Sequence, residues 1–439
     1  MFFLYSFLYT IGFLVLLPRF LFDALRKGKY AAGFWERFGY LPEFERNEKP
    51  VLWLHCVSVG ETQAARPIVK ELLREFPDFQ FVVSTTTNTG QTLARKLFAE
   101  EAKLVFYFPF DWRFTVRRAL RRIKPSIVLI METELWFNFL REAHKSGAKI
   151  AIVNGRLSEK SAKHYSYIKK LISSVLHYID LALMQEHKDA KRLTQLGIRA
   201  DKVKITGNVK FDQDFDENES DLTKELRERF DVSKDAPLII AASTHAPEES
   251  IILRAFKETW ENSSQKLPRL LIAPRHPERF KEVAELVEES GFQSARRSEK
   301  ESEKDKLARV ILLDSVGELR AVFPLAEIVF VGGSLISHGG QNVLEPAMAQ
   351  KAIVTGFYTM NFEAIVKEFL KQNAIVQLPE SSEKEAAKKL AEVFLQLLQD
   401  ADLREKLAKK AFAFAQDNRG ASRKTVEHLK SFLLTREKL

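Results

Sequence analysis

The chain is poor in cysteine: its 439 residues include one, Cys56. A single thiol cannot form an internal disulfide, and a cysteine-rich zinc site needs several thiols. Such a chain suits the reducing cytosol. The nine histidines show no HExxH or other paired metal spacing. The sequence therefore predicts neither a disulfide scaffold nor a metal centre.

The familiar phosphate-binding motifs are also missing. The sequence contains no GxGxxG and no GxxxxGK[ST]. These are the fingerprints of dinucleotide-binding folds and of P-loop enzymes, respectively. A nucleotide site in this chain would have to be built differently.

Charge is missing from the N-terminus, where Met1 to Leu17 contains no charged residue. No basic segment precedes this apolar run and no small-x-small site follows it, so a cleaved signal peptide is not predicted. Seventeen helical residues rise about 26 Å, and residues 18–22 extend this toward the roughly 30 Å hydrocarbon core if Arg19 snorkels. Four basic residues and one acid lie between positions 19 and 29, which predicts a cytoplasmic location for the rest of the chain. We expect residues 1–22 to be a membrane anchor that either spans the bilayer or lies in its interface.

Acidic residues are scarce in the first half. Residues 1–210 carry 34 Lys and Arg against 20 Asp and Glu, whereas residues 211–439 carry 34 against 39. The formal net charge of +9 therefore arises entirely in the first half. This asymmetry predicts an anionic partner there: a nucleic acid, a membrane surface or a phosphorylated substrate.

Short apolar runs alternate with amphipathic stretches along both halves. This alternation predicts parallel sheets covered by helices on both faces. The predicted strands are 51–54, 81–83, 105–106, 127–130, 150–153, 181–183 and 203–206, and then 238–242, 270–272, 310–312, 328–331 and 353–354.

This alternation of strands and helices, together with composition, divides the chain into segments. We expect a membrane anchor at 1–22, an α/β domain at 23–210, a charged interdomain connection at 211–236, a second α/β domain at 237–382 and a helical tail at 383–439. Asp212-Gln213-Asp214 has the DxD form of a metal motif, but it lies in a strongly acidic stretch. Arg296–Lys306 is predicted to be a charged surface loop. Ligands of doubly wound domains bind at the carboxyl ends of strands, so the predicted active site is a cleft between the two sheets.

Three loops in the first half carry candidate catalytic residues. Glu61 follows the first strand beside Gly60, and it is either a general base or a first-turn glutamate that stabilises the helix dipole. Glu132 and Glu134 follow strand 127–130, where carboxylates need partners. Lys210 follows strand 203–206 and is a candidate partner, although a loop lysine is usually just solvated.

The second half has nucleotide-like loops. Arg275, beside Pro274, has the planar fork that suits phosphate. Glycine turns follow at Gly317, at Gly332-Gly333 and at Gly339-Gly340, and their amides are candidate phosphate ligands. Glu345 is a candidate partner of a ribose diol. The joint occurrence of such turns at successive strand ends predicts a nucleotide-binding domain.

At these residues the sequence resembles the 3-deoxy-D-manno-octulosonic acid (Kdo) transferases, bacterial lipid A glycosyltransferases with a GT-B fold. The resemblance covers essentially the whole chain. The matching motifs are Ser58-Val59-Gly60-Glu61-Thr62, Met131-Glu132-Thr133-Glu134-Leu135-Trp136, Arg156-Leu157-Ser158, Gly207-Asn208-Val209-Lys210-Phe211-Asp212, Ser243-Thr244-His245, Pro274-Arg275-His276-Pro277-Glu278-Arg279-Phe280, Gly317-Glu318-Leu319 and Gly332-Gly333-Ser334. Gln341 departs from the His of many members, and Val316 from the common Met.

The resemblance implies roles for particular residues. Glu61 would be the general base, and Glu132 and Lys210 would stabilise the transition state. The CMP moiety of the donor would be held by Pro274, Arg275, Val316, Gly317, Glu318, Asn342, Val343, Leu344 and Glu345. No cofactor or metal is implied.

The implied reaction transfers Kdo from CMP-Kdo to a tetraacyl, bis-phosphorylated lipid A precursor, with inversion, on the cytoplasmic side of the inner membrane. Arg275 and the glycine-turn amides would stabilise the charge on departing CMP. The alternatives are another GT-B transferase or epimerase that uses a UDP-sugar, or a membrane-tethered protein that binds nucleic acid or anionic lipid through the basic helix at Arg117–Lys124.

Overall fold

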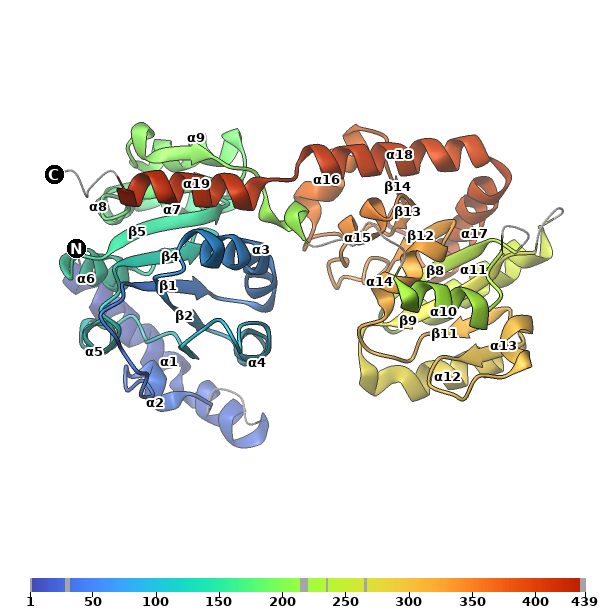
Figure 1. Ribbon diagram of the computed structural model, residues 1–439, viewed down its shortest axis with the longest axis horizontal. Coiled ribbons are helices and arrows are strands. Elements are labelled where there is room, and N and C mark those ends of the chain that lie inside the picture. Colours follow the sequence, from blue (N-terminus) through green and yellow to red (C-terminus); the bar gives the residue numbers. More distant parts are fainter. Residues whose placement is uncertain (1, 28–31, 214–219, 234–235, 264–266, 435–439) are drawn as a thin grey trace. The chain divides into compact units, whose positions relative to one another are not determined.

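The computed structural model describes residues 2–27, 32–213, 220–233, 236–263 and 267–434, and the chain forms two compact units (Figure 1). Unit 1 comprises Met1–Asp214 with Asn418–Leu439, and unit 2 comprises Phe215–Asp417. Each unit is an α/β structure built on one seven-stranded sheet in which every strand pair is parallel.

The sheet of unit 1 has the order β3-β2-β1-β4-β5-β6-β7. Its strands are β1 (Val51–Cys56), β2 (Gln80–Thr85), β3 (Leu104–Tyr107), β4 (Ile127–Met131), β5 (Lys149–Gly155), β6 (Leu181–Met184) and β7 (Val203–Ile205). Its helices are α1 (Phe2–Lys27), α2 (Phe34–Arg37), α3 (Val59–Glu75), α4 (Asn88–Leu97), α5 (Arg113–Ile123), α6 (Phe137–Lys145), α7 (Glu159–Tyr167), α8 (Lys169–Leu176), α9 (His187–Leu196), the 3₁₀ turns η1 (Ala200–Lys202) and η2 (Val209–Asp212), and α19 (Ala421–Leu434).

The sheet of unit 2 has the order β10-β11-β9-β8-β12-β13-β14. Its strands are β8 (Leu238–Thr244), β9 (Arg269–Pro274), β10 (Ser294–Arg296), β11 (Val310–Leu312), β12 (Ile328–Val331), β13 (Ala352–Thr355) and β14 (Val376–Gln377). Its helices are α10 (Asp221–Arg229), α11 (Glu248–Glu261), η3 (Pro277–Arg279), α12 (Phe280–Glu289), α13 (Glu303–Leu307), α14 (Leu319–Val322), η4 (Phe323–Leu325), α15 (Leu344–Met348), α16 (Glu363–Lys371), α17 (Glu383–Gln399) and α18 (Ala401–Asp417).

Alternate residues of the strands feed cores on both faces of each sheet, as doubly wound sheets require. In β1, Val51 and Trp53 join one cluster of buried residues, whereas Leu52 and Leu54 join another. All predicted strands are present. The sequence did not predict β10 and β14, which are short and edge-located.

Each sheet reverses its strand order beside its first strand. In unit 1 the chain moves outward from β1 to β3 and then returns to β4 on the other side of β1. In unit 2, β9, β10 and β11 all lie on one side of β8, with β10 outermost, and β12 lies on the other side. Loops leaving two such neighbouring strands diverge to opposite faces and open a crevice at the carboxyl edge. The preferred ligand position is therefore beside β1 and β4 in unit 1, and beside β8 and β12 in unit 2.

The end of the chain returns to unit 1. In α19, Ala421, Val426 and Leu429 join the core cluster that also holds α3. The Asp212 carboxylate accepts hydrogen bonds from the backbone N–H groups of Gly420 (2.6 Å) and Ser422. Asp212 thus stabilises the start of α19, while Asp214, the other acid of the DxD sequence, lies outside the described residues.

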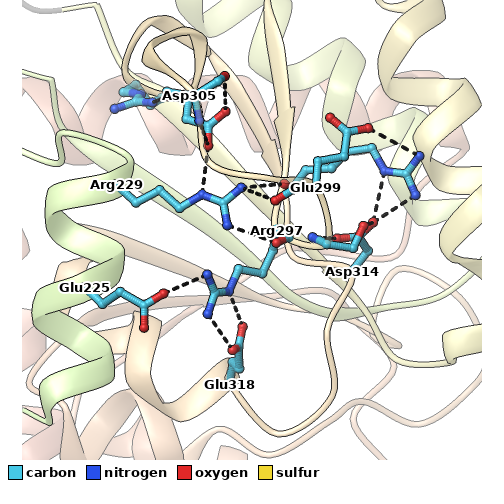
Figure 2. A network of polar contacts seen from close by, with 11 residues as sticks. Glu225, Arg229, Arg297, Glu299, Asp305, Asp314 and Glu318 are labelled. Atoms are coloured by element: carbon cyan, nitrogen blue, oxygen red, sulfur yellow. Dashed lines mark hydrogen bonds and ion pairs between the residues drawn. The ribbon is translucent and has the colours of Figure 1, made fainter.

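The charged segment 296–306 is not a simple surface loop, contrary to the sequence expectation. It includes the end of β10 and most of α13, and a network of ion pairs holds it (Figure 2). The buried Arg229 side chain donates to Asp305 Oδ2 (2.8 Å) and to three backbone carbonyls, those of residues 296, 297 and 299. Because Arg229 ends α10, it fixes part of the predicted interdomain connection to unit 2.

We predict that Arg229→Met destabilises unit 2 by about 3–5 kcal/mol, because it leaves the buried Asp305 carboxylate without its cationic partner. Hydrogen exchange of the β9 and β11 amides would report this loss. Arg423→Met is the matched control, because Arg423 forms an exposed pair with Glu427, and such pairs contribute about 0–1 kcal/mol. Equal protection in both variants would contradict the prediction.

Candidate active site

Glu61 lies in the first turn of α3, directly after β1. Its carboxylate accepts hydrogen bonds from the Val57 N–H (Oε2, 2.7 Å) and the Ser58 hydroxyl (Oε1, 3.0 Å), while Ser58 Oγ caps the helix. The side chain is 7% exposed. Burial raises the pKa of Glu61 to about 7, and the negative charges of Glu132 and Glu134 add to the rise. A carboxylate held in this way both stabilises the helix start and is able to exchange a proton near neutral pH.

Glu132 follows β4, the strand next to β1 at the reversal of unit 1. Its backbone φ is +55°, a left-handed conformation that is unfavourable for a side chain of this kind. Such strain concentrates at functional sites, where the surrounding structure enforces it. Here the Glu132 N–H donates to the Val153 carbonyl (3.0 Å) and fixes the turn. The pKa of nearby Glu134 is raised by burial and by the charge of Glu132.

Lys210 lies in η2, which follows β7. The loop is fixed to the end of β5, because Asn154 Oδ1 accepts from the Val209 N–H (3.1 Å). Burial lowers the pKa of the Lys210 ammonium group; the charges of Glu132 and Glu61 oppose this, and Arg156 adds to it. The structure therefore brings Glu61, Glu132 and Lys210 into one electrostatically coupled cluster. Arg156 also belongs to this cluster. From the sequence, Arg156 was named only as part of the motif Arg156-Leu157-Ser158, and its position near Lys210 was not predicted.

The nucleotide-like loops of unit 2 also gather at the carboxyl edge of their sheet. Pro274 ends β9, and the exposed Arg275 follows it, with its N–H donating to the Thr244 carbonyl (3.0 Å). The stretch Val316-Gly317-Glu318 lies between β11 and α14, and Asn342 to Glu345 leads into α15. Within that stretch, Asn342 Oδ1 accepts from the Leu344 N–H (3.0 Å), while the side chains of Val343 and Leu344 are buried.

Two of the predicted donor-binding carboxylates have partners within the protein. Glu318 accepts two hydrogen bonds from Arg297, at 2.8 and 2.9 Å, and one from the Ser315 hydroxyl (Figure 2). Glu345 accepts from Arg320 Nε (3.0 Å). Val316 is 74% exposed, and Gly317 has φ +95°, so this turn projects from the edge of the sheet. The ion pair of Glu318 with Arg297 therefore holds the turn in place, and the backbone of Val316 and Gly317 is left exposed to a ligand.

The Gly332-Gly333-Ser334 turn corrects one expectation. Its amides do not form an open anion site, because the buried carboxylate of Glu248 already accepts from the N–H groups of Gly333 (2.6 Å), Ser334 (2.9 Å) and Leu335 (2.9 Å). Glu248 also accepts from the His245 N–H (3.0 Å). Since His245 follows β8 and the turn follows β12, Glu248 cross-links the two loops at the reversal of unit 2. Sequence reasoning missed Glu248, because an acid at a helix start usually complements the helix dipole.

Glycine is required at position 332. A Cβ there would lie 2.7 Å from the Ser243 carbonyl oxygen and 2.8 Å from Thr244 Cα, which are backbone atoms that cannot easily move. Ser243 itself has φ +56°. The β8 and β12 loops are therefore in direct backbone contact, and Glu248 fills the remaining hydrogen-bonding positions.

Three imidazoles meet at the same edge. The ring of His245 lies 4.0 Å from that of His338 and 5.1 Å from that of His276, centroid to centroid. His245 Nδ1 donates to the Ser243 carbonyl (3.2 Å), which fixes its tautomer in the neutral form. Burial lowers the pKa of His245 to about 4, and the neighbouring histidines contribute. Within the described ranges, no group of three or more His, Cys, Asp or Glu side chains has an arrangement suited to a metal ion.

Two doubly wound units with functional loops at their strand reversals are the architecture of the GT-B class. Solved structures share it over most of the chain. A UDP-N-acetylglucosamine 2-epimerase from Neisseria meningitidis is 14% identical, covering 88% of this chain and 99% of that one with a TM-score of 0.55. A putative enzyme of the same name from Listeria monocytogenes is 13% identical, covering 90% and 98% with a TM-score of 0.55. At such identities the likeness shows the fold alone.

Sequence relatives are more specific. The family profile described as 3-deoxy-D-manno-octulosonic-acid transferase matches residues 32–213. The 3-deoxy-D-manno-octulosonic acid transferase of Haemophilus influenzae is 33% identical, covering 93% of each chain. That of Chlamydia trachomatis is 31% identical, covering 98% of this chain and 96% of the relative. The chain belongs to the 3-deoxy-D-manno-octulosonic acid transferase family and is therefore a glycosyltransferase.

We predict that Glu248→Gln opens the two loops at the β8–β12 reversal. The amide NH₂ of Gln cannot accept hydrogen bonds, so two of the four backbone N–H groups lose their acceptor, at about 1–3 kcal/mol each. Hydrogen exchange of the amides of residues 333–335 should accelerate accordingly. Glu261→Gln, at the exposed end of the same helix, is the control and should leave these rates unchanged. Unchanged exchange in Glu248→Gln would contradict the assignment.

Proposed function

We propose that this chain transfers Kdo from CMP-Kdo to the tetraacyl, bis-phosphorylated lipid A precursor, lipid IVA, with inversion at the anomeric carbon. The reaction would take place at the cytoplasmic face of the inner membrane during lipopolysaccharide synthesis. Family membership supports the Kdo transfer, and the cluster of Glu61, Glu132 and Lys210 at the strand reversal of unit 1 is the observation that carries the mechanism.

In the proposed mechanism Glu61 is the general base. It takes the proton from the acceptor hydroxyl as the hydroxyl oxygen bonds to the anomeric carbon of Kdo. At the same time the bond from that carbon to the CMP phosphate oxygen breaks, and CMP leaves with the electron pair. A single displacement of this kind inverts the configuration. A base works best when its pKa lies near the operating pH, and burial gives Glu61 a pKa of about 7.

Lys210 and Glu132 would stabilise the transition state. Asn208 and Asn154 accept hydrogen bonds from the backbone N–H groups of Lys210 and Val209, so they fix the backbone of the turn that carries the half-buried ammonium group. A cation carried by a fixed backbone needs little reorganisation when charge develops on phosphate or on the sugar carboxylate. Glu132 lies within electrostatic reach of Lys210 and Glu61 and would keep the ammonium charged despite its burial.

In unit 2 the donor nucleotide would be held by exposed groups rather than by the Gly332-Gly333-Ser334 amides. The guanidinium of Arg275 suits the CMP phosphate, and no ion pair occupies it within the described part of the chain. The projecting turn at Val316-Gly317 and the stretch from Asn342 to Glu345 would contact the remainder of CMP. This assignment explains how Glu318 and Glu345 contribute while paired to arginines: they hold the loops that carry the backbone contacts.

The second candidate function is a GT-B transferase or epimerase that uses a UDP-sugar, because the chain shares its fold with UDP-N-acetylglucosamine 2-epimerases. Competition between CMP and UDP for the purified chain distinguishes the two. Tighter binding of CMP supports the Kdo transferase, and tighter binding of UDP contradicts it. The decisive experiment incubates the chain with CMP-Kdo and lipid IVA and weighs the product by mass spectrometry, where each transferred Kdo adds its residue mass.

We predict that Glu61→Gln lowers the transfer rate by about 10²–10⁴-fold, because the base is lost. The Gln carbonyl can still accept from the Val57 N–H, so the helix start and CMP affinity should persist. Glu75→Gln, on the same helix, loses surface ion pairs with Lys430 and Arg74 and should retain full activity. Full activity of Glu61→Gln would overturn the base assignment.

We also predict a pH dependence. Glu61 must be ionised to accept a proton, so kcat/KM should rise with pH through about 7 and level off above it. Glu134→Gln removes a negative charge that helps to raise the pKa of Glu61, so the rise should move to lower pH. Initial rates between about pH 5 and about pH 9 measure both effects. Activity that falls on raising the pH through neutrality would be inconsistent with a carboxylate base.

A further inference from the structure

Helix α1 is apolar enough and long enough to cross a membrane. However, one face of the helix packs against the rest of unit 1. The Tyr5 hydroxyl donates to Asp111 Oδ2 (2.8 Å), and the Asp111 N–H donates to the Tyr9 hydroxyl (3.2 Å). Asn138 Nδ2 donates to Ser6 Oγ (3.0 Å), and Trp112 Nε1 donates to Thr10 Oγ1 (2.9 Å).

Ring contacts extend this docked face at both ends. Phe2 lies 6.0 Å from Tyr178, and Phe13 lies 4.8 Å from Trp112. The contacts therefore recur at positions 2, 5, 6, 9, 10 and 13, the i, i+3, i+4 spacing of one helix face. Over more than three turns, α1 is packed lengthwise on unit 1.

The opposite face is exposed and purely apolar. Phe3 is 87% exposed and Val15 is 72% exposed. The residues of this apolar face are Phe3, Leu4, Phe7, Leu8, Ile11, Leu14 and Val15. So large a contiguous apolar surface on a soluble protein marks an interaction site.

Exposed aromatic residues of unit 1 lie close to α1. Phe114 stacks on Trp112 (5.8 Å), which itself contacts α1. Phe34 packs on Phe38 (5.1 Å), and Phe38 packs on Phe110, which contacts Phe13. Beside Phe34, Trp35 is 66% exposed. Tryptophan and other aromatic rings of this kind are typical of the membrane–water interface.

Cationic side chains lie on the same helix as Phe114. The guanidinium of Arg118 lies 3.9 Å from the ring centre of Tyr40. Arg121 and Arg122 are exposed on the same helix, α5, and the exposed Lys124 follows directly after it. An apolar face bordered by basic residues matches the surface of a bilayer that contains anionic lipids. This charge complementarity selects a lipid surface over a second copy of the chain, whose own face would carry the same positive charge.

The docked contacts are incompatible with a spanning helix. Beyond Phe13, α1 continues for 14 residues to Lys27, about 21 Å, and this part includes Arg19 and Asp23. A bilayer core needs about 30 Å of apolar helix. A spanning α1 would therefore have to detach from the rest of unit 1. Asp111 would then lose the hydrogen bond from the Tyr5 hydroxyl. This carboxylate is fully buried and also accepts from the N–H groups of Asn138 and Phe139.

We propose that α1 lies in the plane of the membrane surface, with its apolar face and the neighbouring aromatics inserted into one leaflet and its opposite face held on unit 1 by Asp111, Trp112 and Asn138. The choice of a lipid surface accords with the proposed lipid acceptor, but the docking does not depend on transferase activity. The chain then stays on one side of the bilayer, with unit 1 resting against it.

The first test measures binding of the full chain to vesicles of phosphatidylethanolamine and phosphatidylglycerol. Leu8→Glu and Leu14→Glu place a charge on the apolar face without touching the docked face, so each should weaken vesicle partitioning by about tenfold or more. Leu307→Glu is the matched control, because Leu307 is a comparably exposed leucine in unit 2. Equal partitioning of all three variants would overturn the proposal, as would a chain that dimerises through this face instead of binding vesicles.

The second test distinguishes an α1 helix that lies in the membrane surface from one that spans the bilayer. In a Cys56→Ala background, Phe3→Cys and Val15→Cys carry nitroxide labels in vesicle-bound protein. An in-plane helix puts both labels at similar shallow depth, whereas a spanning helix puts them at different depths and exposes position 3 to an impermeant thiol reagent from the far side. Far-side labelling would overturn the proposal.

Transfer in detergent micelles distinguishes this inference from the proposed function. If Leu8→Glu and Leu14→Glu lose vesicle binding but still transfer Kdo to micellar acceptor, both stand. If the unaltered chain binds vesicles through α1 but transfers no Kdo, the function fails and the docking remains.

Discussion

The loops of this protein depend on one recurring interaction: a carboxylate from one segment accepts backbone N–H groups of another. Buried main-chain N–H groups must be satisfied, and loops at the edge of a parallel sheet have no ladder partners. Glu248 satisfies four such groups, Asp111 binds those of Asn138 and Phe139, and Asp212 holds the start of α19. In each case the acid joins elements that are far apart in the sequence, so it defines the loop geometry that the strands alone leave open.

The same interaction has an electrostatic consequence. Burial opposes ionisation and raises the pKa of both Glu61 and Asp111 to about 7, although backbone donors and a hydroxyl stabilise the charged form. At Asp111 the surroundings are closed and the carboxylate is structural. At Glu61 further charged groups, Glu132, Glu134 and Lys210, lie within electrostatic reach, so the proton equilibrium is coupled to a site. The structural acid Asp111 and the proposed catalytic acid Glu61 thus differ in their neighbours rather than in their burial.

Sequence reasoning predicted the sheets well and the loop interiors poorly. Strands such as Ile127–Met131 are continuous apolar runs, and burial on both faces leaves no other arrangement for them. Glu61, Glu132 and Lys210 became candidates because charged residues directly after such strands are conspicuous, and the family resemblance then implied their roles. Glu248 was missed, because its role depends on a turn almost ninety residues away. The apolar run at the N-terminus was likewise ambiguous, since Tyr5, Ser6, Tyr9 and Thr10 reveal their shared face only beside Asp111 and Asn138.

The return of α19 to unit 1 makes unit 2 an insertion within unit 1. During synthesis, the apolar surface of α3 is made before unit 2, but Val426 and Leu429, which cover part of it, are made only after all of unit 2. Unit 2 lies wholly between them in the chain and can complete its own sheet first. The half of the protein that is translated first is therefore the half that finishes folding last, and until then its uncovered α3 face is open to chaperones or to premature association.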